Sequence, residues 1–575
     1  MRLRFHGPLG RVTGSCYQLV DEGRNRQILV DCGLLQDEPG AAAWNEGPFP
    51  FAPGDIDFVL LTHAHLDHCG LLPKLYRDGY RGEVWCTRET AQAARASLVS
   101  AARIGRLPYG DADVTRIRWR HPPGSAPLET TFQLGPDLYA RFLRTSHLPG
   151  AVAIVVAWGP PHGGQRSIVF SGDLGPRRLP SHGALLADRS PVGAADYVVC
   201  ESTYGNTVRP RETLEVDQRL TALADVIDPA LDKGGTVLLP VFALGRAQDV
   251  LFDLTLLFAR NPMKYKHFDV VLHSTLANEI SQIYAEAFAA RQTSRFGELW
   301  PPWLSPALGQ LFGLNCEELS NPLVADMVRV ALIGGAGLSL GYGEPWPDVV
   351  KNWRSIHRVV SGRDAPYQAD GRPRIVIAAA GMCEGGAIVR YLAHLLEHPN
   401  TTVAFTGYQS PSSLGGQIAA VGRLDTCARR QRAGQLAFTW KEKKRTVTRA
   451  VPEADVAARI VQLTGYSGHA DQADLIDWLA PLQDGQRVPV APIAFLTHGD
   501  DRARAGLVEA LAAQVGESLD VECPRPDERW YDLDVGQWLE RAPDGDMHGL
   551  RMLLRMRNQV IANQAAVLRR LRHAA

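Results

Sequence analysis

The sequence predicts an α/β protein: a strand-rich layered sandwich that carries an inserted α/β domain with a parallel sheet. Short β-branched runs that end in Gly, Asp or His, such as residues 27–31 and 57–63, dominate the first 200 residues. From residue 212, long helical patterns alternate with single strands, as in βαβ units. Strand-type runs of the first kind return after residue 401. A pattern that stops and then resumes indicates an insertion and not two consecutive domains.

Four segments follow from these changes of pattern. Residues 1–208 form the first part of the sandwich, 209–400 the inserted domain, 401–515 the part that completes the sandwich, and 516–575 a C-terminal extension with a helical end. A stretch rich in Trp, Pro and Gly, at about 293–353, interrupts the inserted domain as a variable insertion. Helices are expected at 89–102, 212–227, 246–260, 276–291 and 386–398, and later strands at 236–242, 269–273, 374–380, 403–408, 436–441 and 493–498.

Charge and composition exclude several classes of protein. The 575 residues hold 61 Lys and Arg against 62 Asp and Glu, a balance that excludes a globally basic protein coating nucleic acid but not a local basic track. The longest apolar runs fall far short of the roughly 18 residues that span a bilayer, so we expect no membrane-spanning helix and no membrane partner. No apolar signal core follows Met1, and nine cysteines without a CxxC pair favour reduced thiols. We therefore expect a cytoplasmic protein.

The strongest chemical signal is a group of four ligand-type residues, His63, His65, Asp67 and His68, directly after the apolar strand that ends at Leu61. Alternate residues at a strand end point the same way. His63 and His65 can therefore meet one metal ion, while Asp67 and His68, on the following turn, address a second. The alternative, solvated histidines at a strand edge, would crowd three imidazoles and a carboxylate together with no cation to hold them.

Two further strand ends carry ligand-type residues. His147 follows an apolar stretch, and Asp173 follows the strand-type run 168–170. Taken alone, a strand-end histidine is usually just a polar residue, and Asp-Leu-Gly is a common turn. Together with the first group they favour a two-metal site, in which a carboxylate such as Asp173 bridges two Zn²⁺ ions roughly 3.5–4 Å apart.

These residues resemble the motifs of a known family. The run from His63 to His68, with His147, Asp173 and a preceding Asp31, looks like the motif set of the metallo-β-lactamase fold. Three later motifs narrow the resemblance to the β-CASP nucleases: Cys200-Glu-Ser-Thr-Tyr-Gly205, Gly465-Tyr-Ser-Gly-His-Ala-Asp471 and Leu496-Thr-His-Gly-Asp500. The resemblance spans roughly residues 1 to 515. It implies a metallo-β-lactamase αββα sandwich with an inserted β-CASP α/β domain, similar to the endonuclease subunit of pre-mRNA 3′-end processing and its bacterial counterparts.

The resemblance also implies two Zn²⁺ ions per chain. Carried over residue by residue, it gives His63, His65 and His147 to one zinc, Asp67, His68 and His498 to the other, and Asp173 to both. Asp31 is then expected to orient a ligand by a hydrogen bond. A histidine in the third β-CASP motif is typical of members that act on RNA, so His498 favours single-stranded RNA over DNA as the substrate.

The reaction that this resemblance implies is phosphodiester hydrolysis. Two zinc ions lower the pKa of a bridging water towards neutrality and neutralise the phosphate oxygens that it attacks. Asp67 is expected to accept the remaining proton, and His469, hydrogen-bonded to Glu201, to protonate the leaving ribose oxygen. The products are then a 5′-phosphate and a 3′-hydroxyl. Without the family context, His469 is as readily interpreted as a neighbour of the N-cap of a helix that starts near Asp471.

Substrate contacts are expected in further family-type segments, at 240–248, 380–386 and 407–409. The residues expected to contact substrate are Arg246, Gly381 and Tyr408 in these segments, Ser274 in the run His273-Ser-Thr275, and Lys443 and Lys444 in a basic segment described below. His273-Ser-Thr275 stands where the family typically has Asp-Ser-Pro, and Ala380 where it typically has Ser. Both departures lie near the place where relatives handle the substrate phosphate, so substrate register and rate stay open.

Two segments are basic despite the overall neutrality. Residues 423–449 hold nine Lys and Arg against two acidic residues, with Phe438 and Trp440 interleaved. Such a segment is either a track for single-stranded nucleic acid or a solvated hairpin. Residues 541–575 hold seven Arg against two Asp in a helical pattern, which favours docking to a partner protein or homo-oligomerisation over RNA binding.

Taken together, the sequence predicts a zinc-dependent RNA phosphodiesterase. Three alternatives stay open: a DNA nuclease of the same family, a small-molecule hydrolase, and a non-catalytic scaffold. Endonucleolytic and 5′-to-3′ exonucleolytic cleavage are not distinguished by these motifs.

Overall fold

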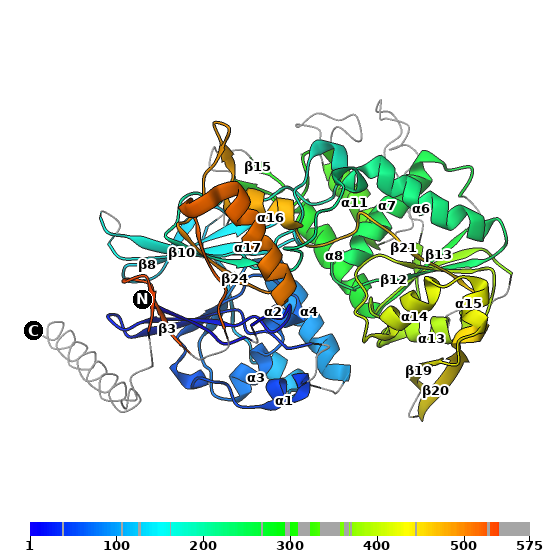
Figure 1. Ribbon diagram of the computed structural model, residues 1–575, viewed down its shortest axis with the longest axis horizontal. Helices are drawn as coiled ribbons and strands as arrows, with labels where there is room; N and C mark the ends of the chain where they lie inside the picture. Colours follow the sequence, from blue (N-terminus) through cyan, green and yellow to red (C-terminus); the bar gives the residue numbers. More distant parts are fainter. Residues whose placement is uncertain are drawn as a thin grey trace, which may run out of the picture.

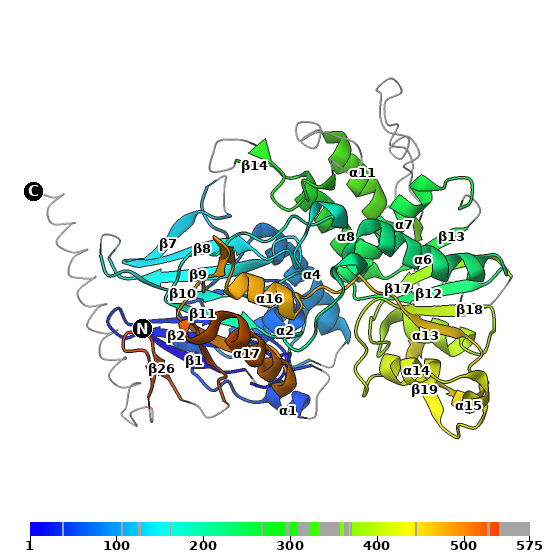
Figure 2. The same cartoon turned by 45° about the horizontal axis from the view of Figure 1, so that its top comes forward.

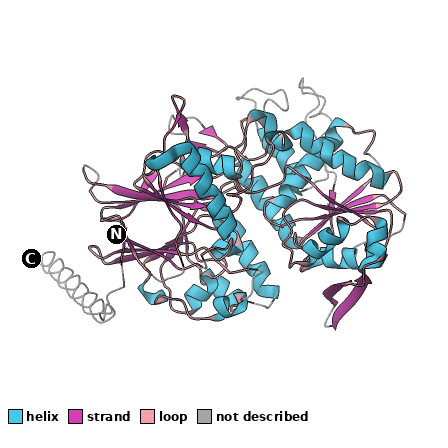
Figure 3. Ribbon diagram, viewed as in Figure 1, coloured by secondary structure: helices cyan, strands magenta, loops and turns pink. Residues whose placement is uncertain are grey.

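The structure is a computed structural model with two parts, a two-sheet sandwich and a second α/β body beside it (Figure 1). Helices cover the outer faces of the sandwich, and the second body has helices on both faces of one sheet (Figure 3). The αββα sandwich with an inserted α/β domain is thereby confirmed. The described residues are 1–7, 9–36, 40–104, 107–124, 128–160, 163–265, 268–293, 299–308, 322–333, 357–360, 367, 371–442, 445–525 and 529–539.

One sheet of the sandwich has eight described strands, and it begins and ends the described chain. Its central strands β3, β4 and β5 run parallel, so their carboxyl ends share one edge. The order of strands is β27 (Gln537–Trp538), β26 (Tyr531–Asp532), β1 (Arg2–Phe5), β2 (Tyr17–Asp21), β3 (Arg26–Val30), β4 (Phe58–Leu60), β5 (Glu83–Trp85) and β6 (Trp119–Arg120). The helices of this layer are α1 (Ala41–Glu46), α2 (Leu66–Cys69), α3 (Leu72–Arg77), α4 (Arg88–Ile104) and α5 (Asp111–Val114).

The second sheet of the sandwich has seven described strands. Strands β10, β11 and β24 are mutually parallel, and β9 runs against both β8 and β10. The carboxyl ends of β8, β10, β11 and β24 therefore lie at one edge. The order is β25 (Asp520–Glu522), β24 (Ile493–Thr497), β11 (Tyr197–Glu201), β10 (Arg166–Phe170), β9 (Val152–Trp158), β8 (Leu138–Arg144) and β7 (Thr131–Gly135), with α16 (Gln472–Leu479) and α17 (Asp501–Val515) packed outside.

Aromatic side chains join the two sheets in the core. Tyr17 of one sheet lies with its ring centre 5.5 Å from that of Phe170 in the other, and its hydroxyl is 2.9 Å from Thr497 Oγ1. Phe5 similarly meets Phe495 at 5.4 Å. Because strand faces alternate, the residues next to these in sequence point outward to the helices. The sandwich is thus one packed unit, and the edges that carry the strand ends are held opposite each other.

The second body is built on a six-stranded, fully parallel sheet in the described residues. Along β12, Val237 and Leu239 pack on one side and Leu238 on the other, so both faces are buried. The order is β16 (His357–Val359), β13 (Asp269–His273), β17 (Arg374–Ala378), β12 (Thr236–Pro240), β18 (Thr401–Phe405) and β21 (Arg459–Gln462). Its helices are α6 (Val216–Leu231), α7 (Arg246–Arg260), α8 (Thr275–Ala289), α11 (Pro322–Ile333), α13 (Gly386–Leu395), α14 (Leu414–Gly422) and α15 (Thr426–Arg430).

The expected return to the sandwich at residue 401 is wrong. Strand β18 pairs with β12, and β21 pairs with β18, so the inserted domain continues to Gln462. The expected strand at 436–441 is part of a separate hairpin, β19 (Gln435–Glu442) and β20 (Arg445–Pro452). It protrudes at the end of the inserted domain that is remote from α2 (Figures 1 and 2). The sequence of a buried apolar strand does not show which strands it pairs with. Such strands therefore cannot be assigned to one sheet or the other from sequence alone.

The segment after residue 515 also differs from the expected extension. Strand β25 pairs with β24, and β26 pairs with β1, so residues 520–538 complete both sheets of the sandwich. Most of the expected insertion at 293–353 and the expected helical end at 541–575 lie outside the described residues. Short hairpins complete the description: β14 (Gln292–Thr293) with β15 (Leu299–Trp300), and β22 (Leu482–Gln483) with β23 (Gln486–Arg487). Within the described residues, no helix is both long and apolar enough to cross a membrane.

A buried ion pair ties the inserted domain to the segment that returns to the sandwich. The Arg219 guanidinium of α6 donates to both carboxylate oxygens of Asp253 of α7, at 2.8 and 3.1 Å. The Tyr466 hydroxyl also donates to Asp253, at 2.9 Å. Tyr466 follows β21 by four residues, so this network fixes where the chain leaves the six-stranded sheet.

Replacing Arg219 by Met is expected to lower the melting temperature of the protein, because Asp253 would then be a buried carboxylate without its ion-pair partner. Breaking one side of such a pair costs about 3–5 kcal/mol. Thermal unfolding of the full chain measures the effect. The double variant Arg219→Met/Asp253→Leu is the control, and a double variant as unstable as the single one would contradict this explanation.

Candidate metal centre

Seven candidate ligands meet where the strand ends of the two sheets face each other. His63, His65, Asp67 and His68 lie in the loop after β4 and in α2. His147, Asp173 and His498 follow β8, β10 and β24. Every one of these strands ends at the shared edge described above, so the rigid sheets bring residues more than 400 positions apart into one place.

The first group of donors consists of His63, His65, His147 and Asp173. Asp173 Oδ2 is 3.3 Å from His63 Nε2 and 3.5 Å from His147 Nε2. His65 Nδ1 is 3.2 Å from His63 Nε2 and 3.0 Å from His147 Nε2. Four donor atoms thus point into one small space.

The second group consists of Asp67, His68, His498 and the other oxygen of Asp173. Asp173 Oδ1 is 3.0 Å from His68 Nε2 and 3.3 Å from His498 Nε2. Asp67 Oδ2 lies 3.9 and 3.8 Å from the same two nitrogens. The two oxygens of Asp173 therefore face different groups.

The donors fit divalent cations. His68 Nε2, His498 Nε2 and Asp173 Oδ1 are buried and have no hydrogen-bond partner. A buried polar atom without a partner costs free energy, and a cation bound between these atoms would remove that cost. Imidazole nitrogens and carboxylate oxygens are common ligands of such ions. The site therefore suits a divalent metal.

Burial favours the neutral, ligating form of several of these histidines. It lowers the pKa of His65 to about 3 and also lowers the pKa of His147 and His498. Burial acts in the same direction on His68, but the carboxylates of Asp173 and Asp31 raise its pKa by more. Metal ligation requires an unprotonated imidazole nitrogen, so low pKa values at three of the histidines match a ligand role.

The opposite ring nitrogens are held by a second layer of contacts. Nδ1 of His68 donates to Asp31 at 2.7 Å, and Nδ1 of His147 donates to the Gly468 carbonyl at 2.7 Å. Such contacts fix the tautomer and the ring orientation. Nδ1 of His498 lies 3.0 Å from Ser15 Oγ, and Nδ1 of His63 lies 3.1 Å from Thr62 Oγ1. Asp31 contacts a candidate ligand, as the sequence predicts. Nothing in the sequence by itself indicates that Ser15, Thr62 and Gly468 contact the other histidines.

The loops that carry the donors pass very close to one another. A Cβ atom at Gly33 would lie 1.6 Å from the Asp67 carbonyl oxygen, and one at Gly175 would lie 2.0 Å from the Ser146 carbonyl oxygen. Ser146 and His498 themselves have positive φ angles, 61° and 48°. Strained backbone of this kind persists where the surrounding structure dictates it and is common at functional sites.

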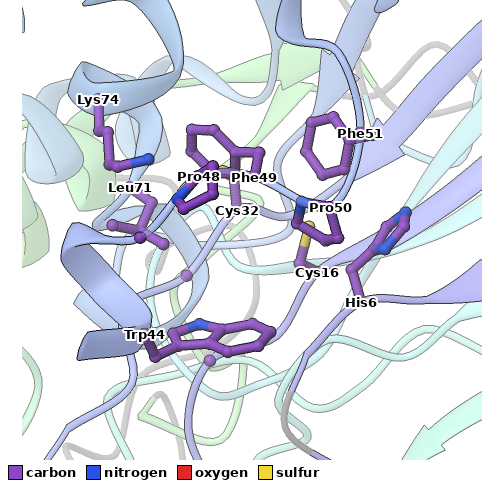
Figure 4. Close-up of a pocket in the computed structure, with 13 residues that line it drawn as sticks. His6, Cys16, Cys32, Trp44, Pro48, Phe49, Pro50, Phe51, Leu71 and Lys74 are labelled. Carbon is purple, nitrogen blue, oxygen red and sulfur yellow. The ribbon is translucent and has the colours of Figure 1, made fainter. Parts of the chain in front are cut away.

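Gly33 also lines a separate pocket on the sandwich (Figure 4). Its walls include Trp44, Phe49 and Phe51, and the Lys74 ammonium lies 3.8 Å from the centre of the Phe49 ring. None of the seven candidate ligands lines this pocket. It is therefore distinct from the space between the donors.

Glu201 and His469 form a third arrangement beside the donors. The Glu201 carboxylate accepts hydrogen bonds from the backbone N–H groups of Leu174, at 2.6 Å, and Thr203, at 3.3 Å. Both of its oxygens lie 3.3 Å from His469 Nδ1. Nε2 of His469 points to Asp173 Oδ2 at 3.8 Å. Burial lowers the pKa of His469, but Glu201 and Asp173 raise it by more, so its pKa lies above the usual value.

The alternative interpretation of His469 was a place next to a helix N-cap. Asp471 is indeed the N-cap of α16, since its carboxylate accepts a hydrogen bond from Asp474 N at 3.0 Å. The ring of His469, however, is directed to Glu201 and away from that cap. His469 therefore lies near the N-cap and also contacts Glu201, but Asp471 alone caps the helix.

Three family models match the chain: the metallo-beta-lactamase superfamily at residues 9–199, the Beta-Casp domain at 247–418, and the Zn-dependent metallo-hydrolase RNA specificity domain at 453–524. Among curated proteins, the chain is 31% identical to "Ribonuclease TTHA0252" of Thermus thermophilus over 515 residues, which cover 89% of this chain and 96% of that protein. The chain belongs to the β-CASP family of the metallo-β-lactamase superfamily.

Further β-CASP relatives are less similar. "Transcription termination factor FttA" of Cenarchaeum symbiosum is 25% identical over 88% of this chain and 67% of its own length. "RNase J-like protein" of Methanocaldococcus jannaschii is 22% identical over 87% of this chain and 92% of its own length. The match over nearly the whole of the Thermus protein shows that the insertion and both sheet-forming parts belong to one family architecture.

Two of the residues expected to contact substrate, Arg246 and Ser274, lie in different surroundings. Arg246 lies next to the metal centre: a Cβ at Gly468 would be 2.3 Å from its Nη2 atom, and its Nη1 pairs with Asp249 at 3.0 Å. Ser274, by contrast, is the N-cap of α8, where its hydroxyl accepts a hydrogen bond from Ala277 N at 3.1 Å. This capping bond gives Ser274 a structural role at that position.

The two departures from the β-CASP pattern lie at strand ends of the parallel sheet. His273 is buried, and its Nδ1 is 3.2 Å from the Tyr391 hydroxyl. Burial lowers the pKa of His273, and Arg390 adds to this effect, so the neutral imidazole is favoured at this position. Ala380 follows β17 and is directly before Gly381, another of the expected substrate contacts.

Part of the basic segment 423–449 is used for folding. Arg429 donates to the carbonyls of Val421 and Ala458, which close a helix end and a strand start, and Arg432 pairs with Glu453 at 2.6 Å. Phe438 is fully buried, so it offers no surface for a base. Arg423, Arg430, Lys441 and Arg445 are exposed, which both a nucleic-acid track and a solvated hairpin require, and Lys443 and Lys444 lie outside the described residues.

Asp31→Asn is expected to weaken divalent-metal binding about 10- to 100-fold, because the neutral amide no longer accepts a charge-assisted hydrogen bond from His68. Competition with a chromogenic chelator measures this affinity. Asp57→Asn is the matched control, since Asp57 accepts a backbone hydrogen bond from Gln27 at the opposite end of the same parallel strands. Equal metal affinity in the two variants would remove Asp31 from the site.

Proposed function

We propose that this protein is a dinuclear zinc ribonuclease that hydrolyses single-stranded RNA to 5′-phosphate and 3′-hydroxyl ends. The observation that carries the proposal is the placement of Asp173, whose two carboxylate oxygens face two separate groups of donors. Sites in which a carboxylate lies between two metals are typical of phosphodiester hydrolysis. In this proposal His63, His65 and His147 hold one zinc, Asp67, His68 and His498 the other, and Asp173 both.

Zinc is the metal that the donor set favours. Each group offers imidazole nitrogens and carboxylate oxygens, which are common zinc ligands. Two bound zinc ions supply a water of lowered pKa and neutralise charge on the phosphate. The protein's own residues must then orient the substrate and move the protons.

Asp67 and His469 are placed to move those protons. Asp67 is half-buried beside His68 and His498, where its carboxylate accepts a proton from the attacking water. As the new P–O bond forms, the P–O3′ bond breaks and the leaving O3′ takes a proton from His469 Nε2. Glu201 stabilises the imidazolium by its contact with Nδ1. Glu201 is itself fixed by two backbone N–H groups, so it orients His469 without touching the substrate.

RNA is favoured over DNA by two lines of support. The relatives include proteins named ribonuclease and RNase J-like protein, and the family model over residues 453–524 is an RNA specificity domain. His498, the third-motif histidine, is present as in family members that act on RNA. An RNA substrate and eight described cysteines, none of them disulfide-bonded, agree with a cytoplasmic enzyme.

Matched RNA and DNA oligonucleotides of one sequence test the substrate. With Zn²⁺ and the full chain, we expect cleavage of the RNA and little or none of the DNA, with 5′-phosphate ends on the products. End-labelled oligonucleotides separated on a gel report the rate and the position of each cut. Preferential cleavage of DNA would establish the alternative nuclease, and a zinc-loaded protein that cuts neither would support a scaffold.

His469→Ala is expected to retain zinc and to lose about 10²- to 10⁴-fold in cleavage rate, because the leaving oxygen then lacks a positioned acid. A substrate with sulfur in place of the bridging O3′ has a leaving group that needs no proton. On this substrate the variant is expected to recover most of the loss. His398→Ala, at an exposed histidine after α13, is the control. An equal loss on both substrates would show that His469 is not the acid.

A further inference from the structure

An exposed aromatic pair, Phe242 and Tyr408, lies at the carboxyl edge of the parallel sheet. Strand β12 pairs in parallel with both β17 and β18, so the loops after these three strands share one edge. Those loops carry Phe242, Gly381 and Gly407 with Tyr408. In open α/β sheets, ligands bind at the carboxyl ends of the strands.

Phe242 is exposed and yet fixed in position. Its side chain is 40% exposed, whereas the preceding residue, Val241, is fully buried in the core. A Cβ atom at Gly381 would lie 2.8 Å from the Phe242 ring, and one at Gly407 would lie 3.8 Å from it. The ring therefore rests against glycine backbone on one side, and only a residue without a side chain fits at Gly381.

Tyr408 extends this surface. It is 60% exposed and follows Gly407 directly. The Gln409 side-chain amide donates to the carbonyls of Gly381 and Gly407, at 3.0 and 3.3 Å, and so ties the two loops together. The aromatic pair is thus pre-organised and not the tip of a loosely held loop.

The aromatic pair is directly connected to the metal centre. The Phe242 carbonyl accepts a hydrogen bond from Ala247 N, at the start of α7. In the same turn, a Cβ at Gly245 would lie 2.9 Å from Leu148, the residue after His147. The next residue, Arg246, is packed against Gly468, whose carbonyl holds His147. One helical turn therefore separates the Phe242 ring from the ligand loop.

We propose that Phe242 stacks on a nucleobase of the single-stranded substrate close to the scissile linkage, and that Tyr408 supports the neighbouring base. This inference rests on the proposed nuclease function and deepens it. Any base presents a π-face, so stacking of this kind tolerates different sequences. The Arg246 guanidinium, which lies against Gly468 beside the ligand His147, supplies positive charge for the connecting phosphate. Of the two aromatic residues in the basic segment, Phe438 is buried and cannot do this, and Trp440 is partly buried against the core of the inserted domain.

Abasic substitutions test the stacking. The full zinc-loaded chain is titrated with a series of fluorescent 2′-O-methyl phosphorothioate oligonucleotides that resist cleavage, each with one base removed. We expect one or two adjacent positions at which loss of the base weakens binding about 5- to 150-fold, the range of one base–aromatic stack. Fluorescence anisotropy measures the dissociation constants.

Phe242→Leu is expected to weaken binding of the complete oligonucleotide by a similar factor and to abolish the difference between complete and abasic oligonucleotides at that position. Phe242→Tyr should keep both. Trp44→Leu, at an exposed aromatic residue in the separate pocket of Figure 4, is the matched control. A 2-aminopurine at the same position should be quenched by the unaltered protein and by Phe242→Tyr only, which tests stacking even if Phe242→Leu folds poorly.

The proposal is overturned if no abasic position weakens binding to the unaltered protein, or if Phe242→Leu still discriminates against the abasic oligonucleotide. These outcomes differ from failure of the nuclease function. A protein that stacks bases but cuts neither RNA nor DNA refutes the enzyme alone, whereas one that cuts RNA and binds abasic oligonucleotides normally refutes the aromatic site alone.

Discussion

The carboxylate of Asp173 is the constraint on which the architecture of the site depends. It is buried, and its two oxygens lie 3.0 to 3.5 Å from the imidazole nitrogens of four histidines, which come from three separate segments of the chain. Packing five histidines and two aspartates so closely is unfavourable unless something of positive charge lies among them, because their ligating atoms are acceptors. Divalent cations satisfy these atoms together. The fold therefore holds a group of residues whose mutual placement suits a divalent metal.

The rest of the sandwich holds these donor atoms in fixed positions. In four of the five histidines the ring nitrogen that points away from the centre meets a fixed partner: Asp31, the Gly468 carbonyl, or a hydroxyl of Ser15 or Thr62. Those partners lie on strand ends or on tight turns between them. The close approach of Gly33 to the Asp67 carbonyl leaves no space for any other residue. Rigid support of this kind matters because a displacement of a donor by about 1 Å is enough to spoil a catalytic geometry.

The sequence predicted which residues gather at the site but misplaced the domain boundaries, for one physical reason. Histidines and aspartates at strand ends can be recognised as candidate metal ligands from their residue type and spacing, as in the run from His63 to His68. A strand such as β18 carries only apolar residues, and these fit any buried sheet. Its pairing with β12 depends on contacts far away in the chain. Likewise nothing in the residue type distinguishes Ser274, which caps α8, from a serine that binds phosphate. Ser15 and Gly468 contact ligand histidines through a hydroxyl and a backbone carbonyl. Such groups are too common in any sequence to indicate a site.

The insertion has a consequence for catalysis that neither sheet could provide alone. The chain leaves the sandwich just after Glu201 and comes back just before Gly468, so the residues that flank the insertion are those that contact each other at the site. The buried network of Arg219, Asp253 and Tyr466 fixes the returning segment to α6 and α7. Helix α7 also carries Arg246, which packs on Gly468. His469 itself is held by the sandwich, through Glu201 and through the hydrogen bond from Ala470 N to the Leu174 carbonyl. Arg246 and Phe242 belong to the inserted domain, so any movement of that domain would move these two residues together relative to His469.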